Sequence, residues 1–395
     1  MSEILDWLIV GGGVHGTHAS RRLVHAGVAP DRLRVLDPHE EPLARWHACV
    51  HNTGMTFLRS PIAHHIDVGP ADLHQFAETE VPDARYARPY HRPATALFRR
   101  HVDAVVERNA LRDLRVRGKA VRLRCEHTHV RVETDRGVLC SRRVVLALGA
   151  GDAPLWPAWA RALRIVVPIV DHVFDPGFVR PNVPPWRHVA VIGGGITAAQ
   201  TAIALARARP GSVTLLSRHT PRIEQFDSDI CWIGERCLRG FRRSNDPDFR
   251  RGIIRRARNR GSMPYDVLKQ LRNAERRGQL HVRRGEVVRW DVDPLGQGVL
   301  LHVGGAQVPL ATDRVLLATG FDPARPGGDF IADAIDAHGL RCAACGYPVV
   351  DPLLRWHPRV HVMGPLAELE VGPVARNIIG ARLAATRLVH AELSS

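Results

Sequence analysis

Lysine is almost missing from this sequence. Of its 55 lysine and arginine residues, only Lys119 and Lys269 are lysines, and the arginines are scattered along the chain among acidic residues. The formal net charge is +15, but proteins that bind nucleic acid or an anionic membrane gather their cations in one run or on one face. A GC-rich coding habit explains the arginine bias more simply. We therefore expect no nucleic-acid or membrane partner, and attraction for anionic cofactors and substrates remains open.

Long apolar runs and a cysteine framework are missing as well. No stretch approaches the ~18 uninterrupted apolar residues of a membrane-spanning helix, and residues 1–10 lack the basic segment of a signal peptide. The seven cysteines are irregularly spaced, which argues against a disulfide framework and favours a reducing compartment. We therefore expect a soluble, cytoplasmic protein. Its 395 residues, 45% of them apolar, suffice for two domains.

The sequence begins with a strand, a glycine turn and a helix. An apolar run from Ile4 to Val10 stops at three glycines, 11–13, and a helical stretch follows from Val14 to His25. A second apolar run, residues 33–36, ends at Asp37 and completes a strand–helix–strand unit.

The same unit returns about 180 residues later. A strand at Val189–Ile192 precedes glycines 193–195, a helix from Ile196 to Ala208 and a strand from Val213 to Leu216. The fold class that this repeat predicts is α/β, with two Rossmann-like dinucleotide-binding domains.

The connecting segments indicate how the domains are nested. Two further apolar runs, 144–148 and 315–319, each end in a glycine, and prolines crowd the segment 154–185. The simplest division has a first domain in two parts, residues 1–185 and 315–395, with a second domain, 186–314, inserted between them. The arginine-rich segment 249–277 has helical spacing and is expected to cover the inserted domain with a solvated face.

The first glycine motif has the chemistry of a dinucleotide site. Gly11 permits the tight turn, Gly13 lets the backbone approach a pyrophosphate, and Gly16 lets helix and strand pack closely. Asp37, at the end of the next strand, accepts hydrogen bonds from a ribose and repels an added phosphate. This site should therefore take FAD or NAD.

The second motif differs where the ribose lies. It keeps Gly193 and Gly195, but the following strand ends in Ser217 and Arg218 in place of a carboxylate. A hydroxyl and a guanidinium suit the 2′-phosphate of NADP, although Arg218 can also be one more of the many arginines. Two nucleotide sites of opposite preference indicate that a hydride passes from NADPH to a flavin.

Further motifs resemble a known family. The paired glycine motifs and Ala318-Thr319-Gly320 resemble the two-dinucleotide-binding flavoproteins. Trp46-His47 followed by Met55-Thr56-Phe57-Leu58-Arg59-Ser60-Pro61 resembles the flavin-proximal segment of the N-hydroxylating monooxygenases, the ornithine and lysine N-hydroxylase type. The stretch 372–377, leading into a small-residue helix, resembles the element that closes over the flavin pyrimidine.

The resemblance implies an activity and a set of site residues. Such enzymes reduce FAD with NADPH, react it with O₂ and hold a C4a-hydroperoxide until an amine takes the distal oxygen. The substrate is then a small molecule, and the heteroatom is an amine nitrogen. The implied flavin-proximal catalytic candidates are His47 and Arg59. The implied cofactor-binding residues are Gly11, Gly13, Gly16, Asp37, Trp46, Met55, Leu58, Gly320, Gly364 and Arg376 for FAD, and Gly193, Gly195, Ser217 and Arg218 for NADPH.

Some features leave alternatives open. Arg59 replaces the lysine of the amino-acid N-hydroxylases, so the substrate can differ from ornithine or lysine. Cys342-Ala-Ala-Cys345 is typical of a redox dithiol, which would make the protein a flavoprotein reductase of disulfides or of a carrier protein. A non-catalytic flavin or NADPH sensor is a third possibility. We expect no metal site, because the paired histidines come without a clear third ligand and the spacing of Cys231 and Cys237 does not suit zinc. The sequence leaves homo-oligomerisation open.

Overall fold

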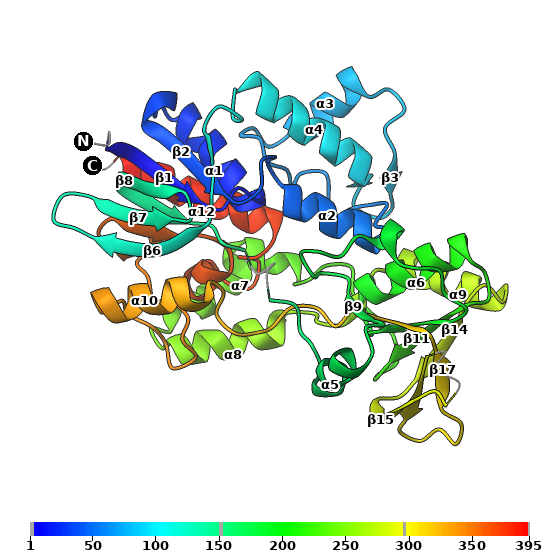
Figure 1. Cartoon of the computed structure of the whole chain (residues 1–395). Coiled ribbons are helices and arrows are strands. Elements are labelled where there is room, and N and C mark those ends of the chain that lie inside the picture. The colour runs from blue at the N-terminus through cyan, green and yellow to red at the C-terminus, as the bar shows by residue number, and fades with distance from the viewer. Residues whose placement is uncertain (1–3, 150–152, 295–297, 394–395) are drawn as a thin grey trace.

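Two sheets, each parallel around its central strand, organise the part of the chain that the computed structural model describes, residues 4–149, 153–294 and 298–393 (Figure 1). Each sheet is centred on the strand that leads into a glycine motif, β1 (Leu5–Val10) or β10 (Val189–Ile192). The helices after these strands, α1 (Val14–His25) and α6 (Ile196–Ala208), begin and end where the sequence predicts. The prediction of two Rossmann-like domains is confirmed.

The first domain holds an eight-stranded sheet whose main path runs β19-β20-β8-β1-β2-β5. β1 lies parallel to β2 on one side and to β8 on the other. The antiparallel pair β6 and β7 branches from β8. Its elements are β1, α1, β2 (Leu33–Asp37), α2 (Ala44–Thr53), α3 (Asp72–Glu80), β3 (Tyr86–Ala87), β4 (Arg92–Pro93), α4 (Thr95–Arg108), β5 (Arg115–Arg117), β6 (Ala120–Cys125), β7 (Val130–Thr134), β8 (Gly137–Leu146), α10 (Gly328–His338), β19 (Arg355–His357), β20 (Val360–Val362), α11 (Glu368–Val371) and α12 (Ile378–Leu393).

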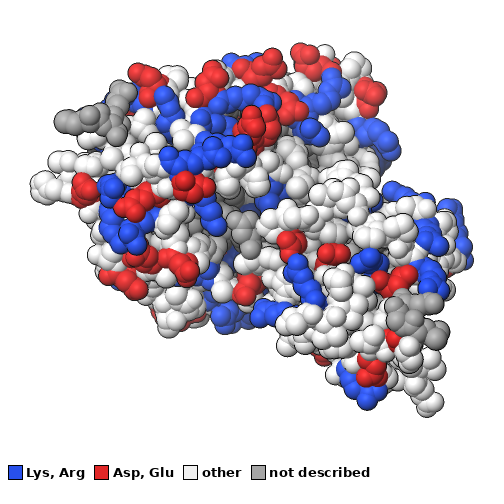
Figure 2. All heavy atoms as spheres, viewed as in Figure 1, with Lys and Arg blue, Asp and Glu red and all other residues white. Residues whose placement is uncertain are grey.

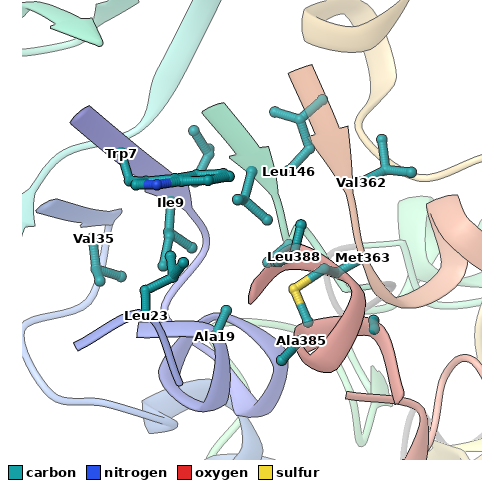
Figure 3. Packing of buried hydrophobic residues seen from close by; sticks show 14 of the residues in the cluster. Trp7, Ile9, Ala19, Leu23, Val35, Leu146, Val362, Met363, Ala385 and Leu388 are labelled. Carbon is teal, nitrogen blue, oxygen red and sulfur yellow. The ribbon is translucent and has the colours of Figure 1, made fainter. Parts of the chain in front are cut away.

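The core of this domain lies between the sheet and the helices α1 and α12. Figure 3 shows side chains of the sheet, among them Trp7 and Ile9, above Leu23 of α1 and Leu388 of α12. All four side chains are fully buried. The C-terminal helix therefore completes the core that the N-terminal strand begins, although the two are far apart in sequence.

The second domain repeats this arrangement with a five-stranded sheet, β14-β11-β10-β18-β9. α6 and α9 pack against each other beside the sheet. A separate antiparallel sheet, β15-β16-β17, extends from it. The elements are α5 (Ala158–Val166), β9 (Val170–His172), β10, α6, β11 (Val213–Ser217), β12 (Arg222–Ile223), α7 (Glu235–Arg243), α8 (Pro247–Ala257), β13 (Ser262–Met263), α9 (Tyr265–Arg276), β14 (His281–Arg284), β15 (Val287–Val292), β16 (Val299–Val303), β17 (Leu310–Thr312) and β18 (Arg314–Leu317).

The second sheet extends beyond the expected limits of 186 and 314 at both ends. β9 lies before residue 186 and pairs with β18, and three of the four residues of β18 lie after residue 314. β18 also pairs with β10. The proline-rich segment hides β9, because that strand is only three residues long. The run 315–317 therefore completes the second domain and does not return the chain to the first.

The two connections between the domains run side by side. Pro154 and Phe321 form an antiparallel bridge. Leu155 donates its N–H to the carbonyl of Gly320 at 2.9 Å, and Asp322 donates to Ala153 at 2.8 Å. The chain therefore enters and leaves the second domain through one two-stranded ribbon.

The arginine-rich segment 249–277 covers both domains, whereas the sequence predicts that it covers only the inserted one. It forms two helices, of which α9 covers the second sheet but α8 packs on α11 of the first domain. Ile254 of α8 shares a small core with Tyr347 and Leu369. A disulfide joins Cys231 and Cys237 beside this core, a pairing that the cysteine spacing did not predict.

Charges of both signs are mixed over the surface. Figure 2 shows basic and acidic atoms interspersed on the visible face, separated by areas of other residues, as the scattered arginines predict. Within the described residues, no helix combines the length and the apolar character that crossing a membrane demands.

The packing of α12 predicts how much stability is lost when one of its buried side chains is shortened. Leu388→Ala should lower the free energy of unfolding by about 2–5 kcal/mol, because a fully buried leucine leaves a cavity. The matched control is Leu393→Ala on the same helix, whose side chain is 72% exposed and which should change the value by less than about 0.5 kcal/mol. Urea unfolding followed by circular dichroism measures both. Equal effects of the two substitutions would contradict the packing in Figure 3.

Candidate functional site

The two glycine loops lie at the carboxyl ends of the central strands. In each sheet, the strand that follows the glycine loop pairs with one side of the central strand, and a later strand pairs with its other side. The loop therefore lies where the strand order reverses. Open α/β sheets bind ligands in the crevice at this switch point.

Glycine is required by geometry in the first loop. Gly11 has φ +108°, and a Cβ there would overlap the carbonyl oxygen of Ala147. A Cβ on Gly16 would overlap the carbonyl oxygen of Gly11, so helix α1 can approach β1 only without a side chain. Gly13 is different, because a Cβ there would meet no atom within 4 Å. Its glycine leaves space beside the N-terminus of α1, which fits a phosphate cradle.

Asp37 lies beside the first loop, as expected. One carboxylate oxygen accepts a hydrogen bond from the N–H of Gly12 at 2.6 Å and the other from the N–H of His39 at 2.8 Å. Arg115 of β5, which sequence reasoning missed, lies 3.6 Å from the carboxylate and donates to the carbonyl of His39. Together Asp37 and Arg115 form a charged pair at the edge of the loop.

His15 is a second residue that sequence reasoning missed. It lies within the glycine motif, in the first turn of α1, and is 8% exposed. Neither ring nitrogen makes a hydrogen bond of normal geometry among the described residues. Burial lowers the pKa of His15 to about 4, and the nearby backbone of Arg376 opposes this shift. A neutral imidazole therefore adjoins Gly364, whose added Cβ would lie 3.6 Å from its ring.

The flavin-proximal candidates of α2 face the first domain. Trp46 packs against Phe98 of α4 with ring centroids 5.0 Å apart, and His47 stacks edge-on against Trp46. Burial lowers the pKa of His47, with Arg99 of α4 adding to the shift. Both rings are therefore supported by α4.

Met55 and Leu58 follow α2 and also lie in the first domain. Met55 is half-buried and packs on its core. Leu58 is buried, and its N–H donates to the carbonyl of Pro93 at 2.9 Å. The opposite face of α2 contacts the second domain, where the side chain of Arg45 donates to the carbonyl of Phe174.

Arg59 connects the two domains. Its guanidinium donates to the carbonyls of Glu224, Gln225 and Phe226 at 2.8–3.0 Å. It also donates to the carboxylate of Asp227 at 2.6 Å and to the hydroxyl of Ser262 at 2.8 Å. These bonds occupy its nitrogens, so the arrangement favours a clamp between domains over direct action on a substrate.

The second loop repeats the geometry of the first. Gly193 has φ +153°, and a Cβ there would overlap the carbonyl oxygen of Ala318. A Cβ on Gly195 would lie 3.3 Å from the Cα of Gly261. The loop after α8 therefore touches the second glycine loop.

The ribose-side residues of this loop lie close together. Ser217 is buried at the end of β11 and donates to the carbonyl of His219 at 2.8 Å. His219, which sequence reasoning missed, lies against Gly194 and Gly261. The side chain of Arg218 is 74% exposed, and its only ion pair among the described residues is with Glu286 at 3.6 Å. It is therefore available to a solvent-side phosphate.

The turn after β18, which contains Thr319 and Gly320, contacts the neighbouring strand β9. His172 of β9 contacts the hydroxyl of Thr319 at 3.1 Å, and that hydroxyl donates to the carbonyl of Leu155. Burial lowers the pKa of His172 to about 4, so it is neutral at pH 7. Gly320 follows with φ +86°, a conformation that favours glycine.

Arg376 lies in a buried ion-pair network. It donates to the carboxylate of Glu368 at 2.8 and 3.2 Å and to the hydroxyl of Tyr347 at 2.9 Å. Arg251 of α8 forms an ion pair with the same carboxylate, and its guanidinium lies 3.9 Å from the centre of the Tyr347 ring. Glu368 is 1% exposed. The network joins the second domain to the C-terminal segment of the first.

Cys342 and Cys345 flank a tight turn. Both are free thiols and half-buried. Ala343 donates its N–H to the carbonyl of Tyr347, and Gly346 donates to the carbonyl of Ala343. Burial raises the pKa of Cys342, which disfavours the reactive thiolate.

Comparison with known families gives one match. A sequence profile described as pyridine nucleotide-disulphide oxidoreductase matches residues 5–240, more than half of the chain. Comparison with curated proteins gives no match.

Solved structures of similar fold include N-hydroxylases and a reductase. The ornithine hydroxylase of Pseudomonas aeruginosa is 16% identical, with a TM-score of 0.76 over 98% of both chains. The ornithine N-hydroxylase of Kutzneria sp. 744, solved with reduced FAD, NADP⁺ and L-ornithine, is 15% identical, with a TM-score of 0.76 over 100% of both. The bacillithiol disulfide reductase of Bacillus cereus is 17% identical, with a TM-score of 0.63 over 99% of both. These likenesses establish a shared fold.

The clamp predicts what removing Arg59 does. Arg59→Ala should lower the free energy of unfolding by about 2–4 kcal/mol, because it leaves Asp227 and three carbonyls without their donor. Arg99→Ala is the control, since that side chain is 67% exposed and its ion pair is 3.9 Å long. Thermal unfolding and limited proteolysis of the domain junction measure the effect. An unchanged melting temperature and cleavage pattern would show that Arg59 does not hold the domains together.

Proposed function

Because the chain belongs to the pyridine nucleotide-disulphide oxidoreductase family, we propose that it is an FAD-dependent monooxygenase that uses NADPH. It would transfer one oxygen atom of O₂ to a heteroatom, an amine nitrogen, of a small molecule. The observation that carries the proposal is the pair of glycine loops with opposite ribose-side charges, a carboxylate at Asp37 and a hydroxyl and guanidinium at Ser217 and Arg218. The similarity of its fold to two ornithine N-hydroxylases supports the hypothesis that it is a monooxygenase.

The residues of the first loop fit FAD. The open space at Gly13 and the N–H groups of α1 would receive the pyrophosphate, and Asp37 would accept hydrogen bonds from the ribose. Beside Gly364, His15 has two ring nitrogens that form no hydrogen bond of normal geometry with any described residue. When bound, FAD would supply the hydride acceptor and the centre that activates O₂.

The residues of the second loop fit NADPH. Gly195 begins α6, so the N–H groups of that helix would face a pyrophosphate. Arg218, exposed and only loosely paired, would contact the 2′-phosphate. Ser217 and His219 would line the ribose.

The protein's own part in the reaction would be positioning and water exclusion. His15 and His172 are neutral at pH 7, because burial lowers the pKa of each to about 4. His15 would therefore add no positive charge beside the flavin, and His172 would add none beside the turn at Thr319. Arg59 would hold the domains at a fixed separation, and a closed crevice protects a reactive flavin from water.

The disulfide-reductase alternative has weaker support. A dithiol that accepts electrons from a flavin needs a lowered thiol pKa and contact with the ring. Burial raises the pKa of Cys342, and Cys345 packs in the small core beside α7.

Product analysis tests the proposal. The FAD-loaded protein is reduced with NADPH without oxygen and then mixed with O₂ and a panel of amines. We expect O₂ uptake, a hydroxylated amine and a delay before the oxidised flavin spectrum returns. Reactions without amine and protein without FAD are the controls. Oxidation of NADPH that yields only hydrogen peroxide, or that reduces disulfides, would refute the assignment.

The glycines of the first loop give a matched pair of variants. Gly13→Ala should leave the melting temperature of the FAD-free protein unchanged but weaken FAD binding at least about tenfold, because its methyl group would fill the phosphate cradle. Gly16→Ala should lower both stability and flavin content, because its Cβ overlaps the backbone of Gly11. Recovery of flavin fluorescence on dilution measures binding. Wild-type FAD affinity in Gly13→Ala would show that the phosphates do not approach this residue.

A further inference from the structure

Four arginines gather between the two glycine loops. We call Arg251, Arg258, Arg260 and Arg376 the arginine cluster. The first belongs to α8, the next two follow it, and Arg376 precedes α12. Arg258 donates to the carbonyl of Pro373 at 3.3 Å, which joins the two segments.

The cluster adjoins both candidate cofactor sites. At one end, the backbone of Arg376 lies beside His15 of the first loop. At the other, Arg260 precedes Gly261, which lies against Gly195 of the second loop. Side chains at this junction are therefore well placed to meet a third ligand between the two cofactors.

The charges of the cluster are not balanced by the protein. Glu368 alone, among the described acidic residues, forms ion pairs with members of the cluster, Arg251 and Arg376. Asp227, the other carboxylate near Arg258, is already paired with Arg59. Two of the four guanidinium groups thus pair with one buried carboxylate, and Arg258 and Arg260 form no ion pair within the described residues.

Donor groups remain available as well. The Nε of Arg251 is buried and has no hydrogen-bond partner among the described residues, and this residue is 4% exposed. The side chain of Arg260 forms no hydrogen bond or ion pair within the part of the chain that the structure describes. Burial lowers the pKa of Arg258 to about 10, and the neighbouring arginines Arg376 and Arg260 add to the shift. An anion placed here would therefore relieve repulsion as well as accept hydrogen bonds.

We propose that the arginine cluster binds an acidic group, a carboxylate or phosphate, on the substrate whose heteroatom is oxidised. The inference rests on the proposed function and deepens it, since the substrate becomes an amine that also carries an anionic oxygen acid. The pyrophosphates of FAD and NADPH have their own donors, the N–H groups at the starts of α1 and α6. Guanidinium groups bind carboxylate and phosphate through paired N–H donors, so several arginines suit an acid with more than one charge.

Phosphorus NMR titration of inorganic phosphate tests this site without turnover. The FAD-loaded protein is titrated with phosphate, first alone and then with saturating NADP⁺. Arg260→Gln and Arg258→Gln should each weaken phosphate binding about tenfold, since each removes charge-assisted hydrogen bonds. Arg260→Lys should lie between wild type and Arg260→Gln, because it keeps the charge and loses the planar donors. Arg277→Gln, an exposed arginine at the end of α9, is the matched control and should bind as wild type.

The outcomes separate the possible sources of the anion. Phosphate binding that survives saturating NADP⁺ supports a substrate site, and competition with NADP⁺ would assign the cluster to the cofactor and overturn the proposal. Equal phosphate affinity in wild type, Arg258→Gln and Arg260→Gln would also overturn it. Arg260 is exposed, so its variants should keep the wild-type melting temperature. If phosphate binds at the cluster but no amine is hydroxylated, the proposed function fails and the anion site stands.

Discussion

The close approach of a helix to the strand before it is the constraint on which this structure depends. In the first domain, α1 starts so near β1 that Gly16 has no room for a side chain next to Gly11. In the second domain, Ala198 of α6 takes the corresponding place, and its Cβ would lie 3.0 Å from a Cβ on Gly193. These contacts aim the first N–H groups of each helix into a crevice, and a backbone donor there needs no side chain to hold a phosphate. Both candidate cofactor sites thus follow from one packing rule applied twice.

Much of the fold could be predicted from local sequence. The helices Val14–His25 and Ile196–Ala208 have the predicted bounds, because apolar periodicity and glycine turns are local signals. The limits of the inserted domain were less accessible, since β9 has three residues among prolines and its pairing with β18 joins distant segments. The position of α8 depends on a core shared with Tyr347, which no local pattern reveals.

The candidate site was also predictable only where local sequence carries the signal. Glycines and Asp37 are readable because their spacing carries the geometry. The partners of Arg59 lie about 165 residues away, so the sequence suggested proximity to a flavin, whereas the structure reveals a clamp. His15 stood inside the glycine motif and was within reach of sequence reasoning, since a histidine in the first turn of a buried helix faces the loop. The disulfide between Cys231 and Cys237 had no such signal, because a spacing of six is not specific.

The ribbon formed by the two connections has a mechanical consequence. Since residues 153–155 and 320–322 are bonded to each other, the second domain cannot slide or swivel on two independent tethers. It can only rotate about this one flexure, and such a rotation must break the contacts of Arg59 as the crevice widens. Exit of a nucleotide from the crevice and release of the contacts between the domains, those of Arg59 and of the Glu368 network among them, thereby become the same motion.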